Sequence, residues 1–229
     1  MRATAIVPVK RFAAAKQRLL GRLDRPQRAA VIKAMLADVL AGIKRVEAVE
    51  RIVVVTGEGR AERLALRHAR RTAVPLEVLR DPKDLGHSEA ATLGIVRAKA
   101  LGASCVVLLP GDCPLLDPAE LDAALDRMRD GRVAVVPDRH GTGTNALLLA
   151  PPDAIGPAFG RGSCARHSEL GRKAGREVAV EPLRSLRLDV DTPADLASLA
   201  ATLKREPELA PATAAELDQP GRARGGAVG

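Results

Sequence analysis

Short apolar runs alternate with amphipathic stretches along most of this chain. The run from Ala3 to Val9 predicts a buried first strand. A helix is predicted after Asp24, because Pro26 stands in its first turn and apolar residues follow at helical spacing: Ile32, Met35, Leu36, Val39, Leu40 and Ile43. Further elements are predicted in alternation, with strands over 51–56, 76–79 and 106–109 and helices over 61–69 and 88–101. This alternation predicts a parallel sheet of the α/β class.

The pattern changes in the second half of the chain. A strand over 133–137, a glycine-rich turn and a second apolar run over 146–149 indicate an antiparallel strand added to the parallel sheet. The other predicted elements are a helix over 117–131, a helix over 165–174, a strand over 186–191 and a helix over 193–204. From Arg205 onward no periodicity remains. We therefore expect one folded domain over 1–204 and a disordered tail over 205–229.

The composition is that of a globular protein. Apolar residues occupy 46% of the 229 positions, which allows one large domain with a substantial core. No apolar run reaches the roughly 20 residues that span a bilayer, and the N-terminus leads into a strand rather than a signal peptide, so we expect a cytoplasmic protein with no membrane partner. Three cysteines, Cys105, Cys113 and Cys164, lack disulfide and zinc-ligand spacing and are expected to be free thiols.

The formal net charge of +8 permits attraction to nucleic acid, to membranes or to small anions. The chain has two Phe and no Trp or Tyr, so it lacks the aromatic side chains on which single-stranded bases usually stack. A solvated basic surface explains the charge better, and we expect no nucleic-acid partner.

Three aspartates follow apolar runs. Asp112 ends the run Val106-Val107-Leu108-Leu109-Pro110-Gly111, which places a carboxylate at the carboxyl end of a central strand, where ligands of α/β sheets bind. Asp189 and Asp191 end a second run, and a period of two points both the same way. Turn formation at Asp112 and helix capping at Asp191 are the alternative explanations. Together the three carboxylates predict a Mg²⁺ site and phosphoryl or nucleotidyl transfer.

The loop after the first strand is cationic. It holds Lys10, Arg11, Lys16 and Arg18, where this class of sheet often binds nucleotide phosphates, although an exposed, solvated loop is an equally good explanation. No glycine occurs before residue 21, so lysines rather than a glycine-rich loop would hold phosphates. Two glycine-rich loops, 141–145 and 159–163, are able to present backbone N–H groups to an anion. His167 either faces the same pocket or lies on a short helix.

In this order the motifs resemble the guanylyltransferases of coenzyme F420 biosynthesis. The resemblance spans residues 6–196. The matching motifs are Val7-Pro8-Val9-Lys10, Ala15-Lys16-Gln17-Arg18-Leu19, Leu109-Pro110-Gly111-Asp112-Cys113-Pro114-Leu115, Pro137-Asp138-Arg139, Gly143-Thr144-Asn145-Ala146-Leu147, Phe159-Gly160 with Ser163 and His167, and Leu188-Asp189-Val190-Asp191-Thr192-Pro193. The resemblance implies a nucleotide-diphospho-sugar-transferase-like fold, mostly parallel, with helices on both faces of the sheet.

It also implies a reaction. The phosphate of phosphoenolpyruvate, 2-phospho-L-lactate or 3-phosphoglycerate joins GMP from GTP, and pyrophosphate is released to yield a product for a downstream transferase. By this resemblance the catalytic residues are Lys16 and the metal ligands Asp112, Asp189 and Asp191. The triphosphate would be held by Lys10, Lys16 and Arg18, and the acceptor carboxylate by Thr144 or Asn145 with Gly160 and Ser163. Many members carry a Leu-Asn pair where this chain has Leu85-Gly86-His87-Ser88.

Other functions are compatible with parts of the pattern. A molybdenum-cofactor nucleotidyltransferase of the same fold would carry a glycine-rich signature after the first strand, where this chain has Val-Pro-Val-Lys. A metal-dependent glycosyltransferase could use Asp189-Val190-Asp191 as its metal motif. A basic nucleic-acid-binding module is disfavoured by the lack of aromatic residues. A homodimer is compatible with each enzyme alternative.

Overall fold

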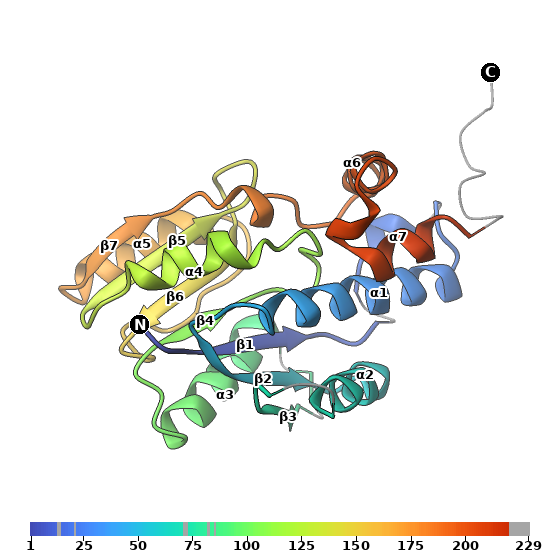
Figure 1. Cartoon of the computed structure of the whole chain (residues 1–229). Helices are drawn as coiled ribbons and strands as arrows, with labels where there is room; N and C mark the ends of the chain where they lie inside the picture. The colour runs from blue at the N-terminus through green and yellow to red at the C-terminus, as the bar shows by residue number, and fades with distance from the viewer. Residues whose placement is uncertain (13–14, 21, 71–72, 82, 85, 220–229) are drawn as a thin grey trace.

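The computed structural model describes residues 1–12, 15–20, 22–70, 73–81, 83–84 and 86–219. They form a seven-stranded sheet in the order β3-β2-β1-β4-β6-β5-β7 (Figure 1). The strands are β1 (Ala3–Val9), β2 (Val49–Thr56), β3 (Leu76–Arg80), β4 (Val106–Leu108), β5 (Arg132–Pro137), β6 (Thr144–Ala150) and β7 (Glu177–Val180). The helices are α1 (Arg25–Ile43), α2 (Gly59–Ala69), α3 (His87–Ala100), α4 (Pro118–Asp126), α5 (Ser163–Lys173), α6 (Pro193–Leu203) and α7 (Pro211–Leu217).

Strand direction follows the predicted pattern. Neighbouring strands pair in parallel from β3 to β4 and from β5 to β7, whereas β6 is antiparallel to both β4 and β5. The register aligns Leu108 of β4 with Leu147 of β6. Because β6 runs backwards, its first residues lie at the edge where the parallel strands end. The prediction of an antiparallel addition is confirmed.

Helices cover both faces of the sheet. Along β1, Ala5 and Val7 pack into the apolar cluster that includes α1 and α4, while Ile6 packs into the cluster under α3 and α5. A strand buried on both faces is expected to be apolar; β1 is apolar apart from Thr4, and β2 is apolar from Ile52 to Val55. Gly94 lets α3 approach β1, because a Cβ at this position would lie 2.3 Å from Ile6 Cγ2. The predicted α/β class and its mostly parallel sheet are confirmed.

Near the carboxyl end, the predicted strand over 186–191 is wrong and one strand was missed. Residues 187–191 form a loop between a short 3₁₀ helix, Arg184–Leu186, and α6. The segment shows an alternating apolar pattern because Leu186, at the end of the 3₁₀ helix, and Val190 are both buried. The backbone groups of 187–191, however, form hydrogen bonds with loops and not with a strand. The edge strand β7, missed from the sequence, has the pattern Glu-Val-Ala-Val, whose end residues are exposed. Short edge strands carry a weak hydrophobic signal.

The predicted disordered tail is also wrong as far as residue 219. A 3₁₀ helix, Pro207–Leu209, and α7 follow α6; α7 lies beside α1, and α6 lies beside α7 (Figure 1). The Asp38 carboxylate of α1 accepts hydrogen bonds from the backbone N–H groups of Ala212 and Thr213 at 3.0 and 2.7 Å. The proline- and alanine-rich segment thus packs on α1 without an amphipathic pattern of its own. Residues 220–229 lie outside the described residues.

No helix in these described stretches is long and apolar enough to cross a membrane. The three cysteines are free and buried.

Candidate active site

The sheet topology gathers polar residues at one edge. Lys10 follows β1, Asp112 follows β4, and Thr144 and Asn145 begin the antiparallel β6. A cavity of about 260 Å³ opens at this edge. Its lining includes Pro8, Lys10, Lys16, His87, Asp112 and Asp191. This is the place where α/β proteins bind ligands.

Lys16 lies at the centre of the charged groups. Its backbone is left-handed, with a φ of 55°, and its ammonium donates to Asp112 and, at 2.5 Å, to Asp191. The side chain is only 9% exposed, so the alternative of an exposed, solvated loop does not hold for Lys16. Burial alone would lower the pKa of Lys16, but the charges of Asp112 and Asp191 outweigh it and the pKa is raised. Lys16 therefore remains charged and pairs with both carboxylates, whose two negative charges it offsets only in part.

Asp189 is brought beside Asp112 by its loop. The backbone N–H of Val190 donates to the Asp112 carbonyl at 3.3 Å. Burial, and after it the charges of Asp112 and Asp191, raises the pKa of Asp189. Asp189 therefore lies near Asp112 and Asp191, on a loop rather than a strand, but it is not among the residues that line the cavity.

Thr144 and Asn145 face different partners, as neighbours on a strand must. The Asn145 side-chain amide donates to the Leu186 carbonyl at 2.7 Å and to Asp189 Oδ1 at 3.3 Å. Both of its amide hydrogens are therefore directed at the aspartate loop, and Asn145 positions Asp189. Thr144 Oγ1 lies 3.0 Å from His167 Nδ1 on the other side.

The second glycine-rich loop closes the site next to Thr144. Gly160 has a φ of 109°, a conformation that favours glycine, and its carbonyl accepts from the Ser163 N–H at 3.0 Å where α5 begins. The backbone N–H of Phe159 donates to Ser88 Oγ at 3.0 Å. This loop is thus fixed to the start of α3, but neither Gly160 nor Ser163 is among the residues that line the cavity.

Two residues differ from the sequence interpretation. Arg18 lies exposed on the 3₁₀ helix Gln17–Leu19 and is not among the residues that line the cavity. His87 does line it, and its ring packs edge-on against Phe159 with centroids 4.6 Å apart. Burial lowers the pKa of His87 to about 4; Asp112 opposes this shift, and Lys10 and Lys16 add to it. The only sequence signal for His87 was the departure from the family pattern at Leu85-Gly86-His87, of which Leu85 lies outside the described residues.

The carboxylates suit a hard cation such as Mg²⁺. Asp112 Oδ1 is buried and accepts no hydrogen bond in the described structure, which leaves one oxygen free for a ligand. No group of three metal-ligating side chains is already assembled among the residues described. In this structure the Lys16 ammonium contacts the carboxylate oxygens of Asp112 and Asp191.

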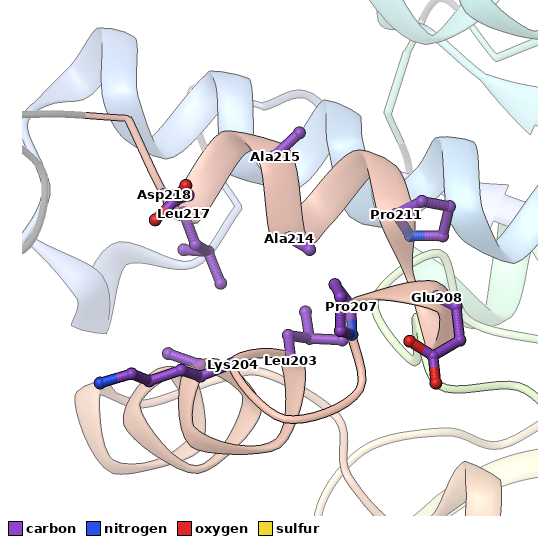
Figure 2. Close-up of a pocket in the computed structure, with 10 residues that line it drawn as sticks. Leu203, Lys204, Pro207, Glu208, Pro211, Ala214, Ala215, Leu217 and Asp218 are labelled. Atoms are coloured by element: carbon purple, nitrogen blue, oxygen red, sulfur yellow. The ribbon is translucent and has the colours of Figure 1, made fainter.

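A larger hollow of about 800 Å³ lies between α6 and α7. Figure 2 shows its lining, in which Leu203, Pro207 and Leu217 accompany Lys204, Glu208 and Asp218. These groups form no constellation for catalysis. The smaller cavity at the sheet edge is therefore the candidate active site.

A mostly parallel sheet with lysines and carboxylates at its carboxyl edge defines a nucleotidyltransferase-like protein. A crystal structure from Desulfovibrio desulfuricans G20, provisionally assigned as a nucleotide-diphospho-sugar transferase, shares this fold. Its TM-score is 0.71 with 22% identity, over 95% of this chain and 94% of that chain.

The family model "Guanylyl transferase CofC like" matches residues 3–202, and the chain belongs to this family. A protein of Conexibacter woesei is 47% identical over 197 residues, covering 85% of this chain and 86% of the relative. A protein of Sphaerobacter thermophilus is 37% identical over 201 residues, covering 87% of this chain and 93% of the relative. Both are named phosphoenolpyruvate guanylyltransferase. The chain is thus a guanylyltransferase, and the molybdenum-cofactor and glycosyltransferase alternatives are not favoured.

Proposed function

We propose that the chain joins GMP from GTP to the phosphate of phosphoenolpyruvate and releases pyrophosphate. The observation that carries the proposal is one cavity in which Lys10 and Lys16 meet Asp112 and Asp191. The names of the two relatives favour phosphoenolpyruvate over 2-phospho-L-lactate and 3-phosphoglycerate as the acceptor.

The chemistry needs little more than alignment and neutralised charge. An oxygen of the acceptor phosphate attacks the α-phosphorus of GTP, a new P–O bond forms, and the bond to the leaving β-phosphate oxygen breaks. The attacking oxygen is already ionised, so no general base is required. Holding two anions in line and offsetting their repulsion then supply most of the rate enhancement.

We assign different residues of the site to each of the two substrates. Lys10 and Lys16 hold the GTP phosphates, because both line the cavity and carry positive charge. Thr144, Gly160 and Ser163 hold the acceptor in this proposal, and the contact between Thr144 and His167 joins the start of β6 to α5, which begins at Ser163. Asn145 contributes by holding Asp189 in place.

Mg²⁺ is part of the proposal. Asp112, Asp189 and Asp191 would hold it, and when bound it would supply positive charge to the phosphates that react. The metal and Lys16 would compete for the same oxygens of Asp112 and Asp191. We therefore expect Lys16 to turn from the carboxylates toward the triphosphate when metal and GTP bind.

The product joins two phosphates in an activated diphosphate linkage. A downstream transferase that consumes such a linkage is the partner we propose, with cytoplasmic GTP as the co-substrate. A homodimer stays a prediction.

Pyrophosphate release from GTP tests the proposal. Each phospho-acid is supplied in turn with Mg²⁺, with the downstream transferase added to remove product, and with ATP and CTP replacing GTP as controls. We expect release that needs both GTP and phosphoenolpyruvate. Release that is independent of any phospho-acid, or faster with another one, would contradict the proposed acceptor.

A further inference from the structure

His167 is fully buried on α5, and both of its ring nitrogens have partners. Nε2 lies 2.8 Å from the backbone nitrogen of Ala158, and Nδ1 lies 3.0 Å from Thr144 Oγ1. A backbone N–H only donates, so Nε2 must accept. A neutral imidazole then carries its one proton on Nδ1, which donates to Thr144 Oγ1. The two contacts together select one tautomer.

The surroundings keep this imidazole neutral. Burial, and after it the charge of Arg166, lowers the pKa of His167 to about 4. A protonated ring would place an N–H at Nε2 against the Ala158 N–H, so two donors would face each other. The structure around Ala158 is therefore compatible only with the neutral ring.

The tautomer decides how the Thr144 hydroxyl points. Its oxygen accepts from His167, so its own proton must be directed elsewhere. Thr144 is half-buried and adjoins Asn145, whose side chain contacts Asp189. A hydroxyl that donates toward this edge suits a carboxylate or phosphate, whereas one that presents lone pairs would repel either anion.

We propose that His167 is a positioning residue that fixes the Thr144 hydroxyl as a hydrogen-bond donor to the anionic acceptor. The proposal rests on the proposed function for the identity of that acceptor. His167 also secures the loop that carries Gly160, through Ala158. The Phe159 ring packs edge-on against His167 and His87, with centroids 5.1 and 4.6 Å apart, so one rigid contact chain joins the acceptor side to the nucleotide cavity.

The tautomer is measured without any substrate. The chain has four histidines, so ¹⁵N-detected correlations of the imidazoles give a simple spectrum, and the signal missing from His167→Gln assigns His167. We expect a neutral ring protonated at Nδ1, the less common tautomer of free histidine. A ring protonated at Nε2, or a charged ring at neutral pH, overturns the proposal whatever the acceptor proves to be.

Kinetics test the connection to Thr144. Thr144→Val and His167→Phe should each raise the KM for phosphoenolpyruvate about tenfold or more and leave the KM for GTP nearly unchanged. The double variant should be little worse than either single variant, because both remove the same donated hydrogen bond. Effects that multiply in the double variant, or an equal rise in both KM values, overturn the proposal.

Conservative variants distinguish the loss of this hydrogen bond from a general folding defect. Thr144→Ser keeps a hydroxyl, and His167→Gln offers one donor and one acceptor, so each should recover part of the acceptor affinity lost in Thr144→Val and His167→Phe. If His167→Gln is as impaired as His167→Phe while melting like the parent, the proposal fails. If the parent enzyme turns over no phospho-acid, the proposed function fails, and the tautomer still decides the role of His167.

Discussion

The Lys16 ammonium lies between Asp112 and Asp191 and donates to both carboxylates. We expect Lys16→Ala to weaken GTP binding and to lower the melting temperature, because Asp112 loses the partner that offset its charge. A loss of about 1–3 kcal/mol would shift the melting temperature by several degrees. Calorimetry and GTP titration measure the two effects.

Mg²⁺ should restore part of the stability that Lys16→Ala loses, since the cation would take the place of the ammonium. Lys33→Ala removes the same charge from an exposed position on α1 and serves as the control. A Lys16→Ala protein that melts like the parent would mean that the ion pairs contribute nothing to stability.

The ionised carboxylate of Asp189, unlike the Lys16 ammonium, is destabilised by its surroundings. Burial, with the charges of Asp112 and Asp191, raises its pKa in the folded chain. A carboxyl with a raised folded pKa is charged at a cost, so its effect on stability becomes unfavourable as pH rises from the ordinary 3.8 through the folded value. Asp189→Asn removes this cost. We expect the metal-free variant to melt at or above the parent at neutral pH, with the difference vanishing toward about pH 4.

Asp189→Asn should also reduce turnover about a hundredfold or more, because a proposed metal ligand is lost. Asp191→Asn is the matched control for stability: Asp191 is half exposed and paired with Lys16, so its loss should not stabilise the chain. Melting curves across pH, with and without chelator, separate the two variants. Near-parental turnover by Asp189→Asn would contradict the three-carboxylate site.

Single residues also show where sequence reasoning ends. Asp112 was predicted because an apolar strand that stops at Pro-Gly-Asp has a local signature. The partners of Lys16 and Asn145 were not predicted, because their contacts with Asp191 and Asp189 cross 175 and 44 positions of the chain. Such contacts depend on the packing of elements, which no local pattern encodes.

At the scale of elements, the predictions succeeded where a segment is long or strongly apolar and has clear signals at its ends. α1 has a capping box formed by Asp24 and Gln27 and a proline in its first turn, and both signals are local. β7 was missed because its signal is short and half polar. Residues 186–191 were misread because buried loop residues and strand residues produce the same alternation. Backbone hydrogen bonds, which the side-chain pattern does not report, distinguish the two.

The packing of α3 on β1 gives an element-scale prediction. In Gly94→Ala, the new methyl would lie 2.3 Å from Ile6 Cγ2, so the helix must move away from the sheet. We expect a loss of about 1–3 kcal/mol in urea unfolding. Because α3 begins at His87 beside the active-site cavity, the KM for GTP should rise as well.

Gly156→Ala is the matched control, since a Cβ there meets no atom within 4 Å. It should unfold at nearly the parental urea concentration. Equal stability of the two variants would mean that α3 and β1 adjust without cost, and the close approach would then have no energetic role.

The folded part of the chain continues past the predicted domain boundary at Lys204. The family model ends at residue 202, yet α7 packs against α1 and buries Ala210 completely. This segment supplies hydrogen-bond donors to the Asp38 carboxylate on α1, because the backbone N–H and the hydroxyl of Thr213 both donate to Asp38. A buried carboxylate that lost these donors would be costly.

A chain that ends after Lys204 should therefore be less stable by about 2–4 kcal/mol, from the lost apolar burial and the lost donors to Asp38. Asp38→Ala separates these two contributions: it should destabilise the full-length chain and have little effect in the shortened chain, where the donors are already missing. Urea unfolding of the four proteins measures the coupling. Pyrophosphate release at low temperature should persist in the shortened chain, because the active-site residues precede Lys204. If the shortened chain unfolds like the full one, the segment after Lys204 is dispensable and the predicted boundary holds for stability.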